Sequence, residues 1–296
     1  MTGDVTGWLV DRYGPRVDAW VAGIPALAAR LAANWGLELG EMFAGGASAV
    51  VFRCVWPDGT PAVLKLSPDR ELLGRQAGML RLFAESGRVP AVLAADPEAG
   101  GVVLTEVRPG TLAEDLPPGS LPPLWAGLLA ALHAVPVPAQ PPGQLGNRCD
   151  EAFDRVGKRL ADPLIGRYLD QKAWALARER CHRLLDTQQK IVLLHGDLHL
   201  GNALDGGAGL IAIDPKACAG DPCWDAVDYV LAGAGREGVR VRCERVASAC
   251  GLDGDRLHEW TRAIAPFALI GQLLDNGPGV EELLSGRDSG RLPGPW

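Results

Sequence analysis

Short apolar stretches separated by turn residues predict a small sheet in the first third of the chain. Residues 47–56 and 61–66 are strand-like, and a Pro-Asp-Gly turn joins them, because Pro presets φ and Gly permits positive φ. Residues 91–95 and 102–107 predict two further strands. Between the two pairs, apolar side chains at helical spacing predict a helix over 68–84.

Helical periodicity dominates the rest of the chain. It covers residues 121–135, 150–188 and 236–275, whereas Ile191–Leu194 and Leu210–Ile213 have the length and branched side chains of short buried strands. The pattern as a whole predicts an α+β protein, with a sheet first and helices afterwards.

Residues 7–35 carry apolar side chains that also indicate helix. Gly14-Pro15 and Pro25 interrupt this stretch, and a proline inside a helix removes a backbone donor. We therefore expect two or three short helices here rather than a long one.

Composition excludes several classes of partner. The formal net charge is −7, from 29 Lys and Arg against 36 Asp and Glu, so neither nucleic acid nor an anionic membrane is an expected partner. The seven cysteines are scattered, as in proteins of a reducing cytosol. Cys218 and Cys223 come nearest to a zinc pattern, but no second pair at ligand spacing follows, so structural zinc is not expected. No signal peptide and no apolar run of about 18 residues is evident. We expect a soluble, cytoplasmic enzyme with no obligate protein partner.

The chemistry concentrates around the segment LLHGDLHLGN, residues 193–202. Asp197 and Asn202 follow the first of the two short strands, and Asp214 follows the second. A carboxylate that accepts a hydroxyl proton, with an amide and a second carboxylate that hold Mg²⁺, is the layout of a phosphoryl-transfer site. The alternative is a turn in which Asp197 and Asn202 cap local backbone.

The residues His195-Gly196-Asp197 through Asn202, followed by Ile213-Asp214-Pro215, resemble the aminoglycoside phosphotransferase family of the protein-kinase-like fold, and most of all its streptomycin 6-kinase and hydroxyurea phosphotransferase group. The resemblance implies a bilobal fold, with an antiparallel-sheet N-lobe over residues 1–106, a mainly helical C-lobe over 107–296 and ATP between them. It also implies Asp197 as the catalytic base and Asn202 and Asp214 as Mg²⁺ ligands. Gly196 stands where a protein kinase has Arg, so a phosphate receptor for an activation segment is not expected.

In the N-lobe the same resemblance assigns a nucleotide site. Lys65, set among apolar neighbours in a predicted strand, is expected to bind the α/β-phosphates, with Glu71 on the next helix as its ion-pair partner and Glu85 as the second candidate. Taken alone, Lys65 would equally suit an edge strand facing water. Ser48, after two glycines, is a candidate phosphate contact in a glycine-rich loop. Glu106 and Val107 are expected to meet the purine through main-chain atoms.

The substrate side is less specified by the sequence. Asp225, near the start of a predicted helix, is either a contact to an amine or hydroxyl of the substrate or an ordinary N-cap. The resulting expectation is transfer of phosphate from ATP to a hydroxyl of a small molecule, in particular a cationic aminoglycoside antibiotic such as streptomycin, which would confer resistance. The alternatives are a kinase for hydroxyurea, another antibiotic or a metabolite, and a silent binding protein on the kinase scaffold.

Overall fold

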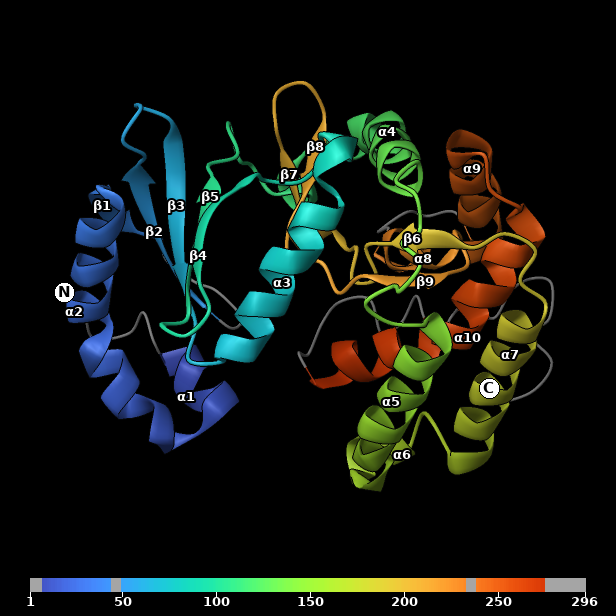
Figure 1. The fold of residues 1–296 in the computed structure, drawn as a ribbon. Coiled ribbons are helices and arrows are strands. Elements are labelled where there is room, and N and C mark those ends of the chain that lie inside the picture. Colours follow the sequence, from blue (N-terminus) through green and yellow to red (C-terminus); the bar gives the residue numbers. More distant parts are fainter. Residues whose placement is uncertain (1–6, 44–48, 233–237, 275–296) are drawn as a thin grey trace. The chain divides into compact units, whose positions relative to one another are not determined.

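The computed structural model describes residues 7–43, 49–232 and 238–274 and divides into two compact units (Figure 1). The first unit comprises residues 1–110 together with 205–207, and the second comprises 111–204 together with 208–296. Each unit buries its own set of apolar side chains.

The first unit is built on a five-stranded antiparallel sheet in the order β1-β2-β3-β5-β4. The predicted hairpin is confirmed, since Val50 pairs with Leu66 and Val55 with Pro61. Gly59 in its turn has φ 89°, which a side chain would disfavour. The strands are β1 (Glu38–Met42), β2 (Val50–Val55), β3 (Pro61–Leu66), β4 (Val92–Asp96) and β5 (Gly101–Thr105).

The two faces of this sheet pack against different helices because side chains alternate along a strand. Leu64 belongs to the core shared with α2 (Asp18–Trp35), whereas Val63 packs into the cluster formed by α3 (Arg70–Leu82). Lys65 has the same parity as Val63, so its side chain lies on the face covered by α3. Figure 1 shows α3 beside β4 and β5 within this unit.

The expected helix break at Pro25 is wrong. After α1 (Gly7–Tyr13) and one turn of 3₁₀ helix, α2 runs without interruption from Asp18 to Trp35 through Pro25. Its buried face, which includes Ile24, Ala28 and Leu31, packs on the sheet. Burial of this face outweighs the backbone hydrogen bond that proline removes.

Helices form most of the second unit, as the periodicity predicts (Figure 1). Helix α10 packs against α7, α8 and α9, and α4 also packs against α9. Among the described residues, no helix is both long and apolar enough to cross a membrane. The helices are α4 (Leu121–His133), α5 (Leu145–Gly157), α6 (Pro163–Gly166), α7 (Gln171–Asp186), α8 (Trp224–Leu231), α9 (Val239–Cys250) and α10 (Gly254–Leu274).

Four short strands carry the loops of interest. The predicted strands appear as β6 (Val192–Leu194) and β8 (Leu210–Ala212), and β8 pairs with β7 (Ala203–Asp205). The partner of β6 is β9 (Cys218–Gly220), a strand that the sequence pattern does not predict. Its three small residues have no alternation to reveal it, and it forms because β6 lies alongside.

Candidate active site

The loop after β6 is held against the segment that follows Asp214. The backbone N–H of Lys216 donates to the carbonyl oxygen of His195 at 2.9 Å, just before β6 and β9 pair at Leu194 and Cys218. Gly196 has φ 80°, and a Cβ at this position would collide with the carbonyl oxygen of Lys216. Glycine is therefore required here both for its conformation and for the close approach.

Asp197 projects from this loop with 28% of its side chain exposed. Its Oδ2 lies 2.7 Å from the ammonium of Lys216 and 3.4 Å from Nδ2 of Asn202, and the same Nδ2 donates to the carbonyl oxygen of Asp197 at 2.9 Å. Within the part of the chain that the structure describes, Oδ1 accepts no hydrogen bond. One oxygen of this carboxylate is thus available to accept a proton from a ligand.

Asn202 and Asp214 are brought together by backbone pairing. The N–H of Ile213 donates to the carbonyl oxygen of Asn202 at 2.9 Å, which sets Asp214 directly beyond that contact. Asp214 has φ 56°, a positive value that no other non-glycine residue described here adopts. Such backbone strain is characteristic of functional sites.

The donor set of Asn202 and Asp214 fits Mg²⁺. Both side chains offer oxygen, which this hard cation prefers, and Mg²⁺ commonly takes one or two protein ligands and completes its shell with water and phosphate. No group of three or more His, Cys, Asp or Glu side chains that could hold a metal occurs among the described residues. The two-ligand arrangement therefore suits a metal that arrives with a nucleotide.

Asp225 on α8 binds the backbone of the loop that carries Asp197. Its side chain has no exposed surface; Oδ2 accepts from the N–H of His195 and Oδ1 from the N–H of Gly196, both at 2.8 Å. Nε2 of His133, at the end of α4, lies 3.1 Å from Oδ2. The N-cap of α8 is Cys223. Both expected roles of Asp225, as substrate contact and as N-cap, are thus corrected: its carboxylate is occupied in fixing the loop.

The electrostatics of this buried group are consistent with a fixed role. Burial alone would raise the pKa of Asp225, but the hydrogen bond from His133 and the neighbouring His195 lower it, so the carboxyl is held ionised. Burial lowers the pKa of His195, against the attraction of Asp225 and Asp197. Its Nε2 donates to the carbonyl oxygen of Ile213 at 3.0 Å. The loop with Asp197 and the strand before Asp214 are therefore joined through a buried, neutral imidazole.

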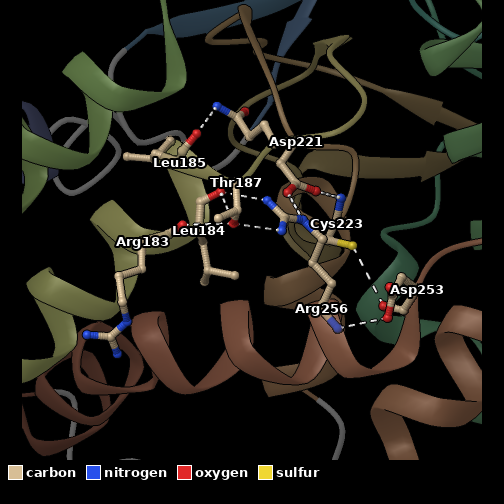
Figure 2. A network of polar contacts seen from close by, with 9 residues as sticks. Arg183, Leu184, Leu185, Thr187, Asp221, Cys223, Asp253 and Arg256 are labelled. Carbon is tan, nitrogen blue, oxygen red and sulfur yellow. Dashed lines mark hydrogen bonds and ion pairs between the residues drawn. The ribbon is translucent and has the colours of Figure 1, made fainter.

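A second polar network braces the segment that leads into α8 (Figure 2). Asp221 is almost fully buried; it pairs with Nε of Arg256, and its Oδ1 accepts from the N–H of Cys223 at 2.9 Å. Arg256 also donates to the carbonyl oxygen of Leu184 at 2.6 Å and to the hydroxyl of Thr187 at 3.2 Å. The guanidinium thus ties α10 and the end of α7 to the segment before Asp225. Breaking such a buried pair typically costs about 3–5 kcal/mol.

In the first unit, Lys65 has a different partner from the expected one. It is buried, and its Nζ lies 3.4 Å from Oε1 of Gln76 on the inner face of α3. Glu71 points outward with 80% of its side chain exposed and pairs with Arg75 at 2.5 Å. The predicted ion pair with Glu71 is therefore wrong, because Glu71 lies on the outer side of the helix. Glu85, the second candidate, is exposed in the 3₁₀ turn after α3.

The expected purine contacts begin where β5 ends. The N–H of Glu106 donates to the carbonyl oxygen of Pro61 at 2.9 Å, so this donor is already used by the sheet. Its carboxylate accepts from Arg53 at 2.7 Å and from Arg108 at 2.6 Å. Burial opposes ionisation of Glu106, but these two arginines lower its pKa. Main-chain binding by Glu106 and Val107 stays a prediction, and Ser48 lies outside the described residues.

The comparisons with known proteins decide the family. A model described as "Phosphotransferase enzyme family" matches residues 40–260. The chain belongs to this family. It is 33% identical over 276 residues to streptomycin 6-kinase of Streptomyces glaucescens, covering 89% of this chain and 85% of the relative. It is 32% identical over 267 residues to hydroxyurea phosphotransferase of Kitasatospora aureofaciens, covering 84% and 74%.

A solved structure supports the fold. The GDP and kanamycin complex of APH(2")-IIia aligns with a TM-score of 0.54 at 18% identity, over 85% of this chain and 93% of that chain. The predicted α+β kinase-like fold is confirmed, and so is the resemblance to the phosphotransferase family. As a member of this family, the protein is a phosphotransferase that acts on a hydroxyl group.

Three residues of the phosphotransferase were missed or only partly understood from its sequence. Gln76 was missed because charge alone favoured a glutamate as the partner of Lys65, although a polar residue within the apolar stripe of α3 was a usable signal. His133 could be placed at the end of a helix, but its bond to Asp225 joins residues 92 positions apart. Lys216, two residues after Asp214, offered the clearest unused signal, because a cation this close to a predicted phosphate site has an evident use.

One further carboxyl lies close to this site. Asp228 follows Asp225 by one turn of α8 and has an exposed side chain without a hydrogen bond to any described residue. The protein around the carboxyl, together with the negative charges of Asp197 and Asp225, raises the pKa of Asp228 to about 7. Its charge therefore changes near neutral pH.

Proposed function

We propose that this phosphotransferase transfers the γ-phosphoryl group of ATP to a hydroxyl of an aminoglycoside antibiotic, with streptomycin as the first candidate, and so confers resistance. The observation that carries the proposal is the arrangement of Asp197, which has one oxygen open to a ligand, on a loop joined by buried hydrogen bonds to the strand before Asp214. A base next to oxygen ligands for Mg²⁺ is what transfer to a hydroxyl requires.

In the proposed reaction, each residue of the site has a specific role. Asp197 orients the acceptor hydroxyl and takes its proton at Oδ1 as the oxygen attacks phosphorus. Asn202 and Asp214 hold Mg²⁺, which when bound neutralises charge on the phosphates. Lys65 binds the α/β-phosphates, and Glu106 and Val107 meet the purine through main-chain groups. Asp225 keeps the backbone of His195 and Gly196 in place, so Asp197 does not have to be ordered at each turnover.

The choice of streptomycin rests on the relatives and on charge. The relative from Streptomyces glaucescens is a streptomycin 6-kinase, and the formal charge of −7 favours a cationic substrate over an anionic one. Hydroxyurea is the second candidate, because a relative of 32% identity is a hydroxyurea phosphotransferase.

The test is a phosphate-transfer assay with Mg²⁺, ATP and a panel of streptomycin, kanamycin and hydroxyurea. We expect transfer to streptomycin, and a fall in kcat of about 10³-fold in Asp197→Asn, since general-base catalysis contributes roughly 10²–10⁴-fold. The matched control is Asp186→Asn, which alters an exposed carboxylate of the same unit at the end of α7. Transfer to hydroxyurea alone would support the second candidate, and full activity of Asp197→Asn would refute the role of the base.

A further inference from the structure

Lys216 is a cation whose backbone is fixed from several sides. Its N–H donates to the carbonyl oxygen of His195 at 2.9 Å, and its own carbonyl oxygen accepts from the guanidinium of Arg148. A Cβ at residue 196 would collide with the same carbonyl oxygen, so glycine is required there. The main chain at Lys216 is therefore hydrogen-bonded to the loop that carries Asp197.

The side chain of Lys216 ends at the base. Nζ lies 2.7 Å from Oδ2 of Asp197, and about half of the lysine side chain (49%) is exposed. Oδ1, the other oxygen of the same carboxylate, accepts no hydrogen bond from any described residue. A hydroxyl that binds to Oδ1 would thus come close to the ammonium, and so would the phosphoryl group that this hydroxyl attacks.

We propose that Lys216 is a further catalytic residue, which binds a non-bridging oxygen of the phosphoryl group during transfer. The inference rests on the proposed function. In the step, a bond forms between the acceptor oxygen and the γ-phosphorus, the bond from that phosphorus to the bridging oxygen of ADP breaks, and the hydroxyl proton passes to Asp197. The side chain of Lys216 offsets the charge on the phosphoryl oxygens.

A purely positional role makes a different prediction. If Lys216 served only to orient Asp197, its removal would impair proton acceptance but not the binding of a phosphoryl mimic. An exposed ion pair typically contributes only about 0–1 kcal/mol, and half of the Lys216 side chain is exposed. Loss of the orienting contact alone would therefore cause a small loss of activity. Loss of a cation that binds the transferred phosphoryl group would cause a large loss, since removal of one such electrostatic contact typically lowers kcat about 10²–10³-fold.

The test compares Lys216→Met and Lys216→Arg with Lys190→Met, which alters an exposed lysine of the same unit that forms no ion pair with any described residue. With Mg²⁺, ATP and streptomycin, we expect Lys216→Met to lower kcat about 10²-fold while the KM for ATP changes less than about fivefold. Lys216→Arg should recover part of kcat because it keeps the charge, and Lys190→Met should match the wild type.

A binding measurement without turnover separates the two roles. ADP with Mg²⁺ and aluminium fluoride, in the presence of streptomycin, mimics the phosphoryl group during transfer. We expect Lys216→Met to bind this fluoride complex at least tenfold more weakly than the wild type does, while its affinity for ADP alone is unchanged. Unchanged binding of the fluoride complex together with full kcat would overturn the proposal, and unchanged binding with reduced kcat would assign Lys216 to positioning instead. Absence of transfer by the wild type to every compound of the panel would count against the proposed function itself.

Discussion

Replacement of Asp225 by alanine should destabilise the second unit and loosen the loop that carries Asp197. The carboxylate satisfies two buried backbone donors, the N–H groups of His195 and Gly196 at 2.8 Å each, and pairs with His133. Each buried donor left without a partner costs about 1–3 kcal/mol, and removal of one member of a buried charged pair costs about 3–5 kcal/mol. We therefore expect a loss of about 4 kcal/mol, a large part of the roughly 5–15 kcal/mol that stabilises a typical domain.

Urea unfolding followed by tryptophan fluorescence measures this loss. With an m-value of about 2 kcal/mol/M, the unfolding midpoint of Asp225→Ala should fall by roughly 2 M. Hydrogen exchange in native buffer should show faster exchange of the amides of His195 and Gly196, because these amides lose their acceptors. The control is Asp186→Ala, which removes an exposed carboxylate at the end of α7 in the same unit and should leave both readings nearly unchanged.

The pH dependence gives a further check of the same reasoning. The pKa of Asp225 is lowered in the folded protein, so its contribution is present above the unfolded pKa of about 3.9 and is lost as pH falls through the folded pKa. The difference between wild type and Asp225→Ala should therefore be full at pH 7 and shrink below about pH 4. An Asp225→Ala protein with wild-type midpoint and unchanged exchange at these two amides would refute the assignment.

Two more predictions concern the neighbourhood of the site. Gln76→Leu keeps the side-chain volume but removes a long hydrogen bond to the buried ammonium of Lys65. In steady-state kinetics it should raise the KM for ATP about fivefold, equivalent to roughly 1 kcal/mol. Glu71→Gln, on the outer side of the same helix, should leave the KM for ATP unchanged. Asp228, whose pKa is raised to about 7, contributes stability that is complete below about pH 4 and is lost as pH rises through 7. Asp228→Asn should thus raise the thermal midpoint at pH 8.5 but not at pH 4, and the gain in stability should stay below about 1 kcal/mol because the group is exposed. An equal shift at both pH values would contradict this.

The sequence is informative where chemistry and local pattern coincide. Asp197, Asn202 and Asp214 could be named because polar residues at fixed spacing follow two short apolar strands, and the hairpin around Gly59 follows from turn chemistry. The sequence does not reveal a hydrogen-bond partner that comes from a distant element. The role of Asp225 depends on hydrogen bonds to a loop about 30 residues away, which local rules for helix starts cannot reveal.

Helix faces show the same limit. Glu71 and Gln76 are both polar residues of α3, and charge alone favoured the glutamate as the partner of Lys65. Which side of the helix meets the sheet is decided by where Leu73, Ala77 and Leu80 pack, and that stripe carries Gln76 with it. A polar residue within an apolar stripe is the signal that would have pointed to the glutamine.

Gly196 also shows why this loop differs from the catalytic loop of a protein kinase. A side chain there would need a positive φ and would strike the carbonyl of Lys216, so the long arginine found at this place in protein kinases cannot be accommodated by this backbone. The N–H of Gly196 is instead bound by Asp225, and the neighbouring His195 carbonyl by Lys216. The loop is thus held by buried hydrogen bonds within the chain. In a protein kinase, an arginine at this place can instead pair with a phosphorylated segment. Asp197 is therefore carried by a loop whose backbone is fixed by contacts within the second unit.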